Sequence, residues 1–156
     1  MVESGFISEY TFHTNKKKNS LHRLSDEYSM FHLKNKTFGK GVWQNIATSS
    51  SYISWSGFSF ETICLKHIDQ IKKGLNIQRI FSTNSAWFNK NAQIDLMIDR
   101  ADNVINLCEL KFSKTPFTIT KASHKNLKNK KDQFYIDTKT RKNINITRVS
   151  SKSKVH

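Results

Sequence analysis

Acidic residues and a lysine interrupt two apolar segments of the chain, in places where buried β-strands are expected. The first segment, "AQIDLMID", carries Asp95 between two aliphatic residues, and the second, "VINLCELKF", carries Glu109 and Lys111 on either side of Leu110. Moving an unpaired charge into a protein core costs several kcal/mol, so charges in core strands normally have partners. These residues therefore indicate a site in which the charges act together.

The expected site is an oxygen-only metal centre next to a lysine. If the two segments pair as antiparallel strands around the turn "DRADN", Asp95 and Glu109 lie at the same end of a hairpin, each about six residues from the turn. Two carboxylates and the backbone carbonyl of Leu110 suit Mg²⁺ or Mn²⁺. Lys111 would project from the same strand face as Glu109, where it could orient or deprotonate a metal-bound water and stabilise charge on a phosphate. The set predicts phosphodiester hydrolysis.

A structural ion network is the alternative interpretation of the same residues. In that network Asp95 and Glu109 would pair with Lys111 or Arg100 at the end of a strand, without any chemistry. The spacing alone does not choose between these interpretations, because an aspartate followed by Glu-x-Lys is common in unrelated sequences. Both remain open at this level.

A helix precedes the strands and carries a third acidic residue. The stretch "SWSGFSFETICLKHIDQIKKGLNI" has apolar residues at spacings of three and four, which predicts one buried stripe. Ser54 or Ser56 could cap the start of this helix, and Gly74 suits its end. Glu61 lies on the flank of the stripe and could point along the edge of the sheet. The stripe consists of Phe60, Cys64, Ile68, Ile71 and Leu75.

Three strands are expected after this helix, in "IQRIFS", "AQIDLMID" and "VINLCELKF". Strict alternation puts on one face of the second strand Gln93, Asp95 and Met97, and on its other face Ile94, Leu96 and Ile98. Alternation in the third strand groups Ile105, Leu107, Glu109 and Lys111. Both strands are apolar on each face over much of their length, as in a sheet covered by helices on both sides.

A lysine-rich helix and a last strand complete the expected order. The segment "ITKASHKNLKNKKDQF" predicts a helix with Ile119, Ala122 and Leu127 on one side, and "NINITRV" predicts a strand. The lysines of this helix could follow a nucleic-acid backbone, with a solvated helix face as the alternative. Expected nucleic-acid contacts are Gln93, Lys121, Lys125, Lys128, Lys130 and Lys131. The fold class is thus α/β, a helix, three strands, a helix and a strand in a mixed sheet flanked by helices.

The composition favours a polyanionic partner. The 156 residues suit one ordinary domain, and 26 Lys and Arg against 12 Asp and Glu give a formal charge of +14. A lysine-rich solvated surface is the plainer explanation of that excess. The two cysteines lack metal-ligand spacing, no apolar run is long enough for a membrane span, and the first residues lack a signal-peptide pattern. We expect a cytoplasmic protein.

The chain resembles the PD-(D/E)XK nuclease superfamily, which has the restriction-endonuclease-like fold, in "FE", "QIDL" and "CELKF". More specifically, it resembles the C-terminal part of a bacterial and archaeal family of AAA+-type ATPases. There a P-loop ATPase is followed by a winged-helix segment and a PD-(D/E)XK-like domain. The resemblance runs in order through "SGFISEY", "LHRLSDEYSMFHLK", "WSGFSFETICLKHIDQIKKGL", "AQIDLMIDRADNVINLCELKFSKTPFTITK" and "NLKNKK".

This resemblance implies a role for each matching residue. Asp95 and Glu109 would ligate Mg²⁺ or Mn²⁺, Lys111 would be the catalytic lysine, and Glu61 would be the assisting acid on the helix. It also implies a division of the chain into a winged-helix remnant at 1–35, whose two short strands suit a hairpin, a connector at 36–52, a nuclease-like domain at 53–149 and a disordered tail at 150–156. DNA is the implied substrate.

The chain departs from the family in two respects. It has no GxxxxGK[ST] sequence, so no ATP hydrolysis is expected from it. It also carries only the last part of a winged helix and ends earlier than the family does, which suggests a fragment of a longer protein, with a P-loop ATPase encoded nearby as a partner. A non-catalytic nucleic-acid-binding or regulatory module and an inactive gene remnant are the alternatives.

Overall fold

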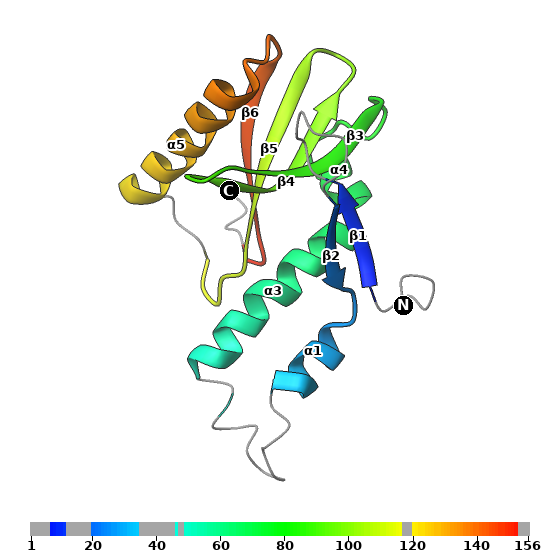
Figure 1. Ribbon diagram of the computed structural model, residues 1–156, viewed down its shortest axis with the longest axis vertical. Helices are drawn as coiled ribbons and strands as arrows, with labels where there is room; N and C mark the ends of the chain where they lie inside the picture. Colours follow the sequence, from blue (N-terminus) through cyan, green and yellow to red (C-terminus); the bar gives the residue numbers. More distant parts are fainter. Residues whose placement is uncertain (1–6, 12–19, 35–45, 47–48, 117–119, 153–156) are drawn as a thin grey trace.

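The computed structural model (Figure 1) describes residues 7–11, 20–34, 46, 49–116 and 120–152. Most of the predicted connector at 36–52 and of the predicted tail at 150–156 lies outside these residues, as does Ile119. The elements are β1 (Ile7–Thr11), β2 (Ser20–Leu24), α1 (Glu27–Lys34), α3 (Ser50–Lys66), α4 (Ile68–Gly74), β3 (Ser82–Phe88), β4 (Gln93–Arg100), β5 (Val104–Lys111), α5 (Lys121–Thr138) and β6 (Asn143–Ser150).

A four-stranded mixed sheet forms the centre of the molecule, in the order β3-β4-β5-β6. The pairs β3–β4 and β4–β5 are antiparallel, whereas β5 and β6 are parallel and are connected through α5. The predicted order of helix, three strands, helix and strand is confirmed, with the first helix divided into α3 and α4. The predicted α/β class with helices flanking a mixed sheet is also confirmed.

Helices α3 and α4 cover one face of the sheet. Cys64 of α3 packs against Leu96 of β4 and against Cys108 and Leu110 of β5 in one buried cluster. All five residues of the predicted apolar stripe belong to this cluster or pack against it, so the periodicity identified the buried side correctly.

Helix α5 covers the opposite face through a single fully buried residue, Phe134. Its ring lies 5.2 Å from the ring of Trp87, edge to face, and the indole Nε1 of Trp87 donates a 3.0 Å hydrogen bond to Asp137 of the same helix. Because Trp87 is fully buried, it cannot stack on a nucleic-acid base. Ala122, predicted to face the core, is exposed, because only the second half of α5 meets the apolar part of the sheet.

Helix α3 begins earlier than its sequence indicated. Ser49 is its N-cap, with the hydroxyl accepting a hydrogen bond from the backbone N–H of Tyr52, so the helix occupies residues that were predicted as connector. The serine-rich sequence is compatible with helix because Ser54 and Ser56 donate their hydroxyls to backbone carbonyls one turn earlier. The predicted caps at Ser54 and Ser56 are therefore wrong, whereas the predicted end at Gly74 is confirmed.

The first strand of the sheet, β3, begins at the end of the segment that was predicted to form it, so the predicted position is wrong. Residues 77–81 form turns in which Ile77 is buried under α4, and β3 is formed by the more polar "STNSAWF". Strand β3 is an edge strand, where polar side chains can face water, so hydrophobicity located the wrong segment. The turn between β4 and β5 is confirmed as tight, with Asn103 in the left-handed region at φ 66°.

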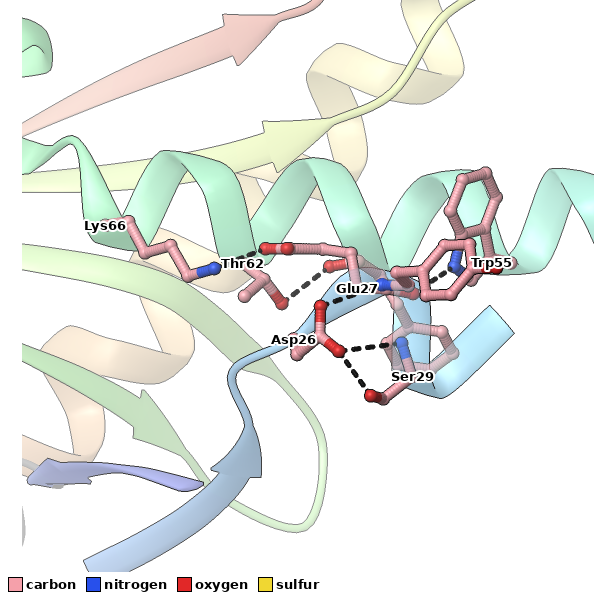
Figure 2. A network of polar contacts seen from close by, with 8 residues as sticks. Asp26, Glu27, Ser29, Trp55, Thr62 and Lys66 are labelled. Carbon is pink, nitrogen blue, oxygen red and sulfur yellow. Dashed lines mark hydrogen bonds and ion pairs between the residues drawn. The ribbon is translucent and has the colours of Figure 1, made fainter. Parts of the chain in front are cut away.

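The predicted N-terminal hairpin is confirmed as an antiparallel pair of β1 and β2, and β1 lies against β3. Figure 2 shows how the following helix α1 attaches to α3. Asp26 caps α1 by accepting from the backbone N–H of Ser29 at 2.9 Å, Glu27 pairs with Lys66 at 2.8 Å, and Trp55 donates its indole N–H to the carbonyl of Glu27 at 3.0 Å. The N-terminal segment is thus joined to the domain.

Candidate functional site

Asp95 and Glu109 lie on adjacent antiparallel strands at the end of the hairpin remote from its turn. Leu96 pairs with Cys108, so Asp95 and Glu109 each lie next to the last residue pair of the two strands. The Oδ2 atom of Asp95 accepts a 3.0 Å hydrogen bond from the backbone N–H of Leu110. Burial chiefly, and the negative charge of Glu109 to a smaller extent, raise the pKa of Asp95. The two carboxylates predicted to share a cation therefore act on each other.

A β-bulge in β4 coincides with Asp95. Ser85 pairs with Met97 and Trp87 pairs with Ile94, so Asp95 and Leu96 together face a single residue of β3. Ile94 consequently packs in the same cluster as Met97, and the strict alternation predicted for this strand is wrong at its first half. A bulge changes the direction of side chains and is frequent beside functional sites. The alternation predicted for β5 is confirmed by the two core clusters.

Burial dominates the electrostatics of Asp95. Desolvation raises its pKa, the hydrogen bond from Leu110 opposes that shift, and the charge of Glu109 adds to it. The positive charges of Lys130 and Arg23 lower the pKa again. Asp95 is therefore a partly buried acid held between another acid and two cations, which is an environment common at functional sites.

Glu61 joins the same cluster from helix α3. Its side chain is 23% exposed and lies 3.2 Å from the guanidinium of Arg23, whose own side chain is 19% exposed. Burial and the charge of Asp95 raise the pKa of Glu61, whereas Arg23 and Lys111 lower it. Asp95 is thus coupled electrostatically to Glu61 of α3 and to Glu109 of β5, and these three acids are called the acidic cluster.

Glu109 is paired with a lysine from α5. The Nζ atom of Lys130 contacts Oε2 of Glu109, and the two side chains are 16% and 19% exposed. Arg148 of β6 is the register partner of Glu109 in the parallel pair, and it donates a 2.8 Å hydrogen bond to Ser123 of α5. Cations therefore surround Glu109 on the side of the sheet that α5 covers.

Lys111 and Gln93 are exposed at the margin of the cluster. Lys111 forms no ion pair with any described residue, although its charge lowers the pKa of Glu61. Gln93 begins β4 and pairs with Phe88 of β3. Lys111 is thus an exposed cation next to half-buried carboxylates.

The lysines of α5 point in different directions around the helix. Lys121, Lys125 and Lys128 are exposed, Lys131 is half-buried, and Lys130 faces the sheet. Lys130 was predicted as a nucleic-acid contact, but in this structure its partner is Glu109. Only the exposed lysines form an outward basic face.

The structural alternative had named the wrong partners. Arg100 pairs with Asp102 and hydrogen-bonds Asn106 near the turn, so it takes no part in the acidic cluster. The cations that do pair with the cluster, Arg23 and Lys130, are 38 and 21 residues from their partners in the sequence. No local pattern could have indicated either contact.

The predicted metal ligands are all oxygen atoms. The described residues contain no group of three or more His, Cys, Asp or Glu placed to hold a metal. Mg²⁺ needs fewer protein ligands than that, because it is usually held by one or two carboxylates and keeps several waters. Asp95, Glu109 and the backbone carbonyl of Leu110 supply oxygen only, which agrees with this type of coordination.

Comparison with protein families adds an assignment. The family model of archaeal and bacterial proteins of unknown function, DUF234, matches residues 25–133. The chain belongs to the DUF234 family. The matched segment contains all four predicted site residues and Lys130, but it excludes Arg23 and β6. Searches of curated proteins and of solved structures each return no significant match. No helix in the described part of this DUF234 chain has the length and hydropathy of a membrane span.

Proposed function

We propose that this DUF234 domain is a metal-dependent nuclease acting on DNA, with a restriction-endonuclease-like core. The observation that carries the proposal is the electrostatic coupling of Asp95 to both Glu61 and Glu109, near the exposed Lys111. Perturbed acids of this kind cluster at active sites more often than elsewhere. The order of helix, three strands, helix and strand agrees with the proposed core.

Each residue has a distinct role in the proposed reaction. Asp95, Glu109 and the carbonyl of Leu110 would hold Mg²⁺ or Mn²⁺, which supplies Lewis-acid chemistry and an acidified water when bound. Lys111 would orient the attacking water or accept its proton, and it would stabilise the negative charge that develops on the phosphate. Glu61 assists from α3, and the exposed lysines of α5 bind the nucleic-acid backbone.

The wider setting of the domain is also a proposal. The hairpin of β1 and β2 followed by α1 agrees with the remnant of a winged helix, and we infer that the domain belongs with an AAA+-type ATPase encoded nearby. A cytoplasmic location follows from that setting.

DNA cleavage tests the proposal directly. Purified wild-type protein with Mg²⁺ or Mn²⁺ is expected to nick supercoiled plasmid, and EDTA should abolish the nicking. Lys111→Ala is expected to lower the initial rate by at least about tenfold, because it removes a positive charge from the reacting phosphate. Lys73→Ala, which changes an exposed lysine of α4 that has no described ion pair with the three acids, is the matched control. If wild type and Lys111→Ala are equally inert at high protein concentration, the nuclease proposal fails.

A non-catalytic DNA-binding module is the second candidate. It is favoured by the ion pairs of Glu61 with Arg23 and of Glu109 with Lys130, which already compensate two of the three acids. That module would bind DNA with a steep salt dependence and would leave the plasmid intact in the same assay.

A further inference from the structure

The ammonium group of Lys130 interacts with both acids that are proposed to bind metal. It contacts Oε2 of Glu109, and both side chains are mostly buried. The same charge favours the ionised form of Asp95. One lysine therefore compensates both proposed ligands. Lys111, by comparison, is exposed and forms no described ion pair with Asp95 or Glu109.

Lys130 also belongs to the helix that offers exposed lysines to a phosphate backbone. Its neighbours along α5 include Lys125 and Lys128, which are exposed on the outward side of the same helix. A lysine side chain has four flexible carbons and carries its charge as a point, so it can exchange one anionic partner for another. A bound phosphate would be a competing partner for this ammonium group.

We propose that Lys130 is an internal counter-cation. In the free protein it pairs with Glu109, and when a nucleic-acid phosphate becomes its partner instead, Glu109 is released to bind the metal. This inference rests on the proposed nuclease function. A cation already paired with Glu109 makes the approach of a second cation less favourable, because like charges repel strongly where burial reduces screening. Metal and DNA should therefore bind cooperatively, each increasing the affinity of the other by the same factor.

Arg23 does not fulfil this role. It pairs with Glu61, the assisting acid, and not with the two proposed ligands. It lies on β2 and not on the lysine-rich helix. Its guanidinium also has a fixed planar geometry, which favours a lasting pair with a carboxylate. We expect Arg23 to stay in place when metal binds.

Titration of Mn²⁺ into the full chain, with and without a short DNA duplex, tests the role of Lys130. A Lys111→Ala background slows cleavage during the measurement. In that background the duplex is expected to raise the Mn²⁺ affinity at least about fivefold. Adding Lys130→Gln should raise the DNA-free affinity several-fold and abolish the gain from DNA, whereas adding Lys130→Arg should preserve the behaviour of the parent. Adding Lys73→Gln, on the opposite face of the sheet, controls for net charge.

The outcomes separate this inference from the proposed function. If Lys130→Gln and Lys73→Gln have equal effects on the DNA-free Mn²⁺ affinity, or if Lys130→Gln weakens binding, the counter-cation role is overturned. Plasmid cleavage by the wild type would then still support the nuclease. If no variant binds Mn²⁺ with or without DNA, both the proposed metal site and the proposed role of Lys130 are wrong.

Discussion

The Asp95→Asn variant is expected to cleave DNA at least about 100-fold more slowly than wild type, since a metal contributes several kcal/mol to such a reaction and about 1.4 kcal/mol is tenfold in rate. Asparagine keeps the shape of the side chain, and its carbonyl oxygen can still accept from Leu110, as Oδ2 of Asp95 does at 3.0 Å. The loss would therefore come from the missing charge. Initial rates on plasmid DNA at fixed Mg²⁺ measure it. A wild-type rate for Asp95→Asn excludes Asp95 from the reaction.

The same variant should be at least as stable as wild type at neutral pH. The folded-state pKa of Asp95 is raised above its ordinary value of 3.8, so between those two values the folded chain binds more protons than the unfolded chain. The free energy of unfolding from this group therefore falls as pH rises through that window. The asparagine side chain of the variant does not titrate, so the melting temperature of Asp95→Asn relative to wild type should be higher at pH 7.5 than at pH 4.

Asp102 provides a control of opposite sign in the same pH series. Arg100 holds the pKa of Asp102 below its ordinary range, so this carboxylate stabilises the fold above that range and loses the effect as pH falls. Asp102→Asn should therefore give no gain in melting temperature at pH 7.5. Melting curves recorded in EDTA remove any effect of metal. Equal pH dependence of the two variants would contradict a raised pKa of Asp95 in the folded chain.

Phe134→Ala is expected to destabilise the domain by about 3–5 kcal/mol, the usual cost of deleting a buried aromatic ring. Phe134 is fully buried and is the one buried residue of α5 in the described structure. Its loss would leave Trp87 without its edge-to-face neighbour at 5.2 Å. Because domains of this size have only about 5–15 kcal/mol of stability, the melting temperature should fall on the order of 10 °C.

Tyr135→Ala is the matched control for the aromatic substitution. Tyr135 follows Phe134 in the same helix, but it is 57% exposed. Exposed substitutions usually change the free energy of unfolding by less than about 0.5 kcal/mol. Similar losses for the two variants in chemical denaturation would show that α5 does not cover the sheet through Phe134.

Periodicity predicted the parts of this fold that depend on local sequence. The apolar stripe from Phe60 to Leu75 identified the buried side of α3 and α4, because residues three and four apart share a helix face. The two central strands were identified because they are apolar on both faces. Their tight turn then placed Asp95 and Glu109 at one end of the hairpin.

The remaining features depend on contacts that no local pattern encodes. The bulge at Asp95 exists only relative to β3, and β3 itself is a polar edge strand that hydrophobicity does not mark. Arg23 and Lys130 reach their acids through the tertiary fold, across 38 and 21 residues of sequence. The acids of the cluster were therefore predictable, and their cationic partners were not.

The melting temperature of the metal-free chain during addition of Mn²⁺ or Mg²⁺ measures whether Asp95 and Glu109 bind a divalent cation together. A ligand that binds only the folded state stabilises it by about 2.7 kcal/mol at a concentration 100 times its Kd. Wild type should therefore melt several degrees higher in saturating Mn²⁺, and the Asp95→Asn, Glu109→Gln double variant should show no shift. The same shift in both proteins, or none in wild type, would contradict a metal site at this cluster.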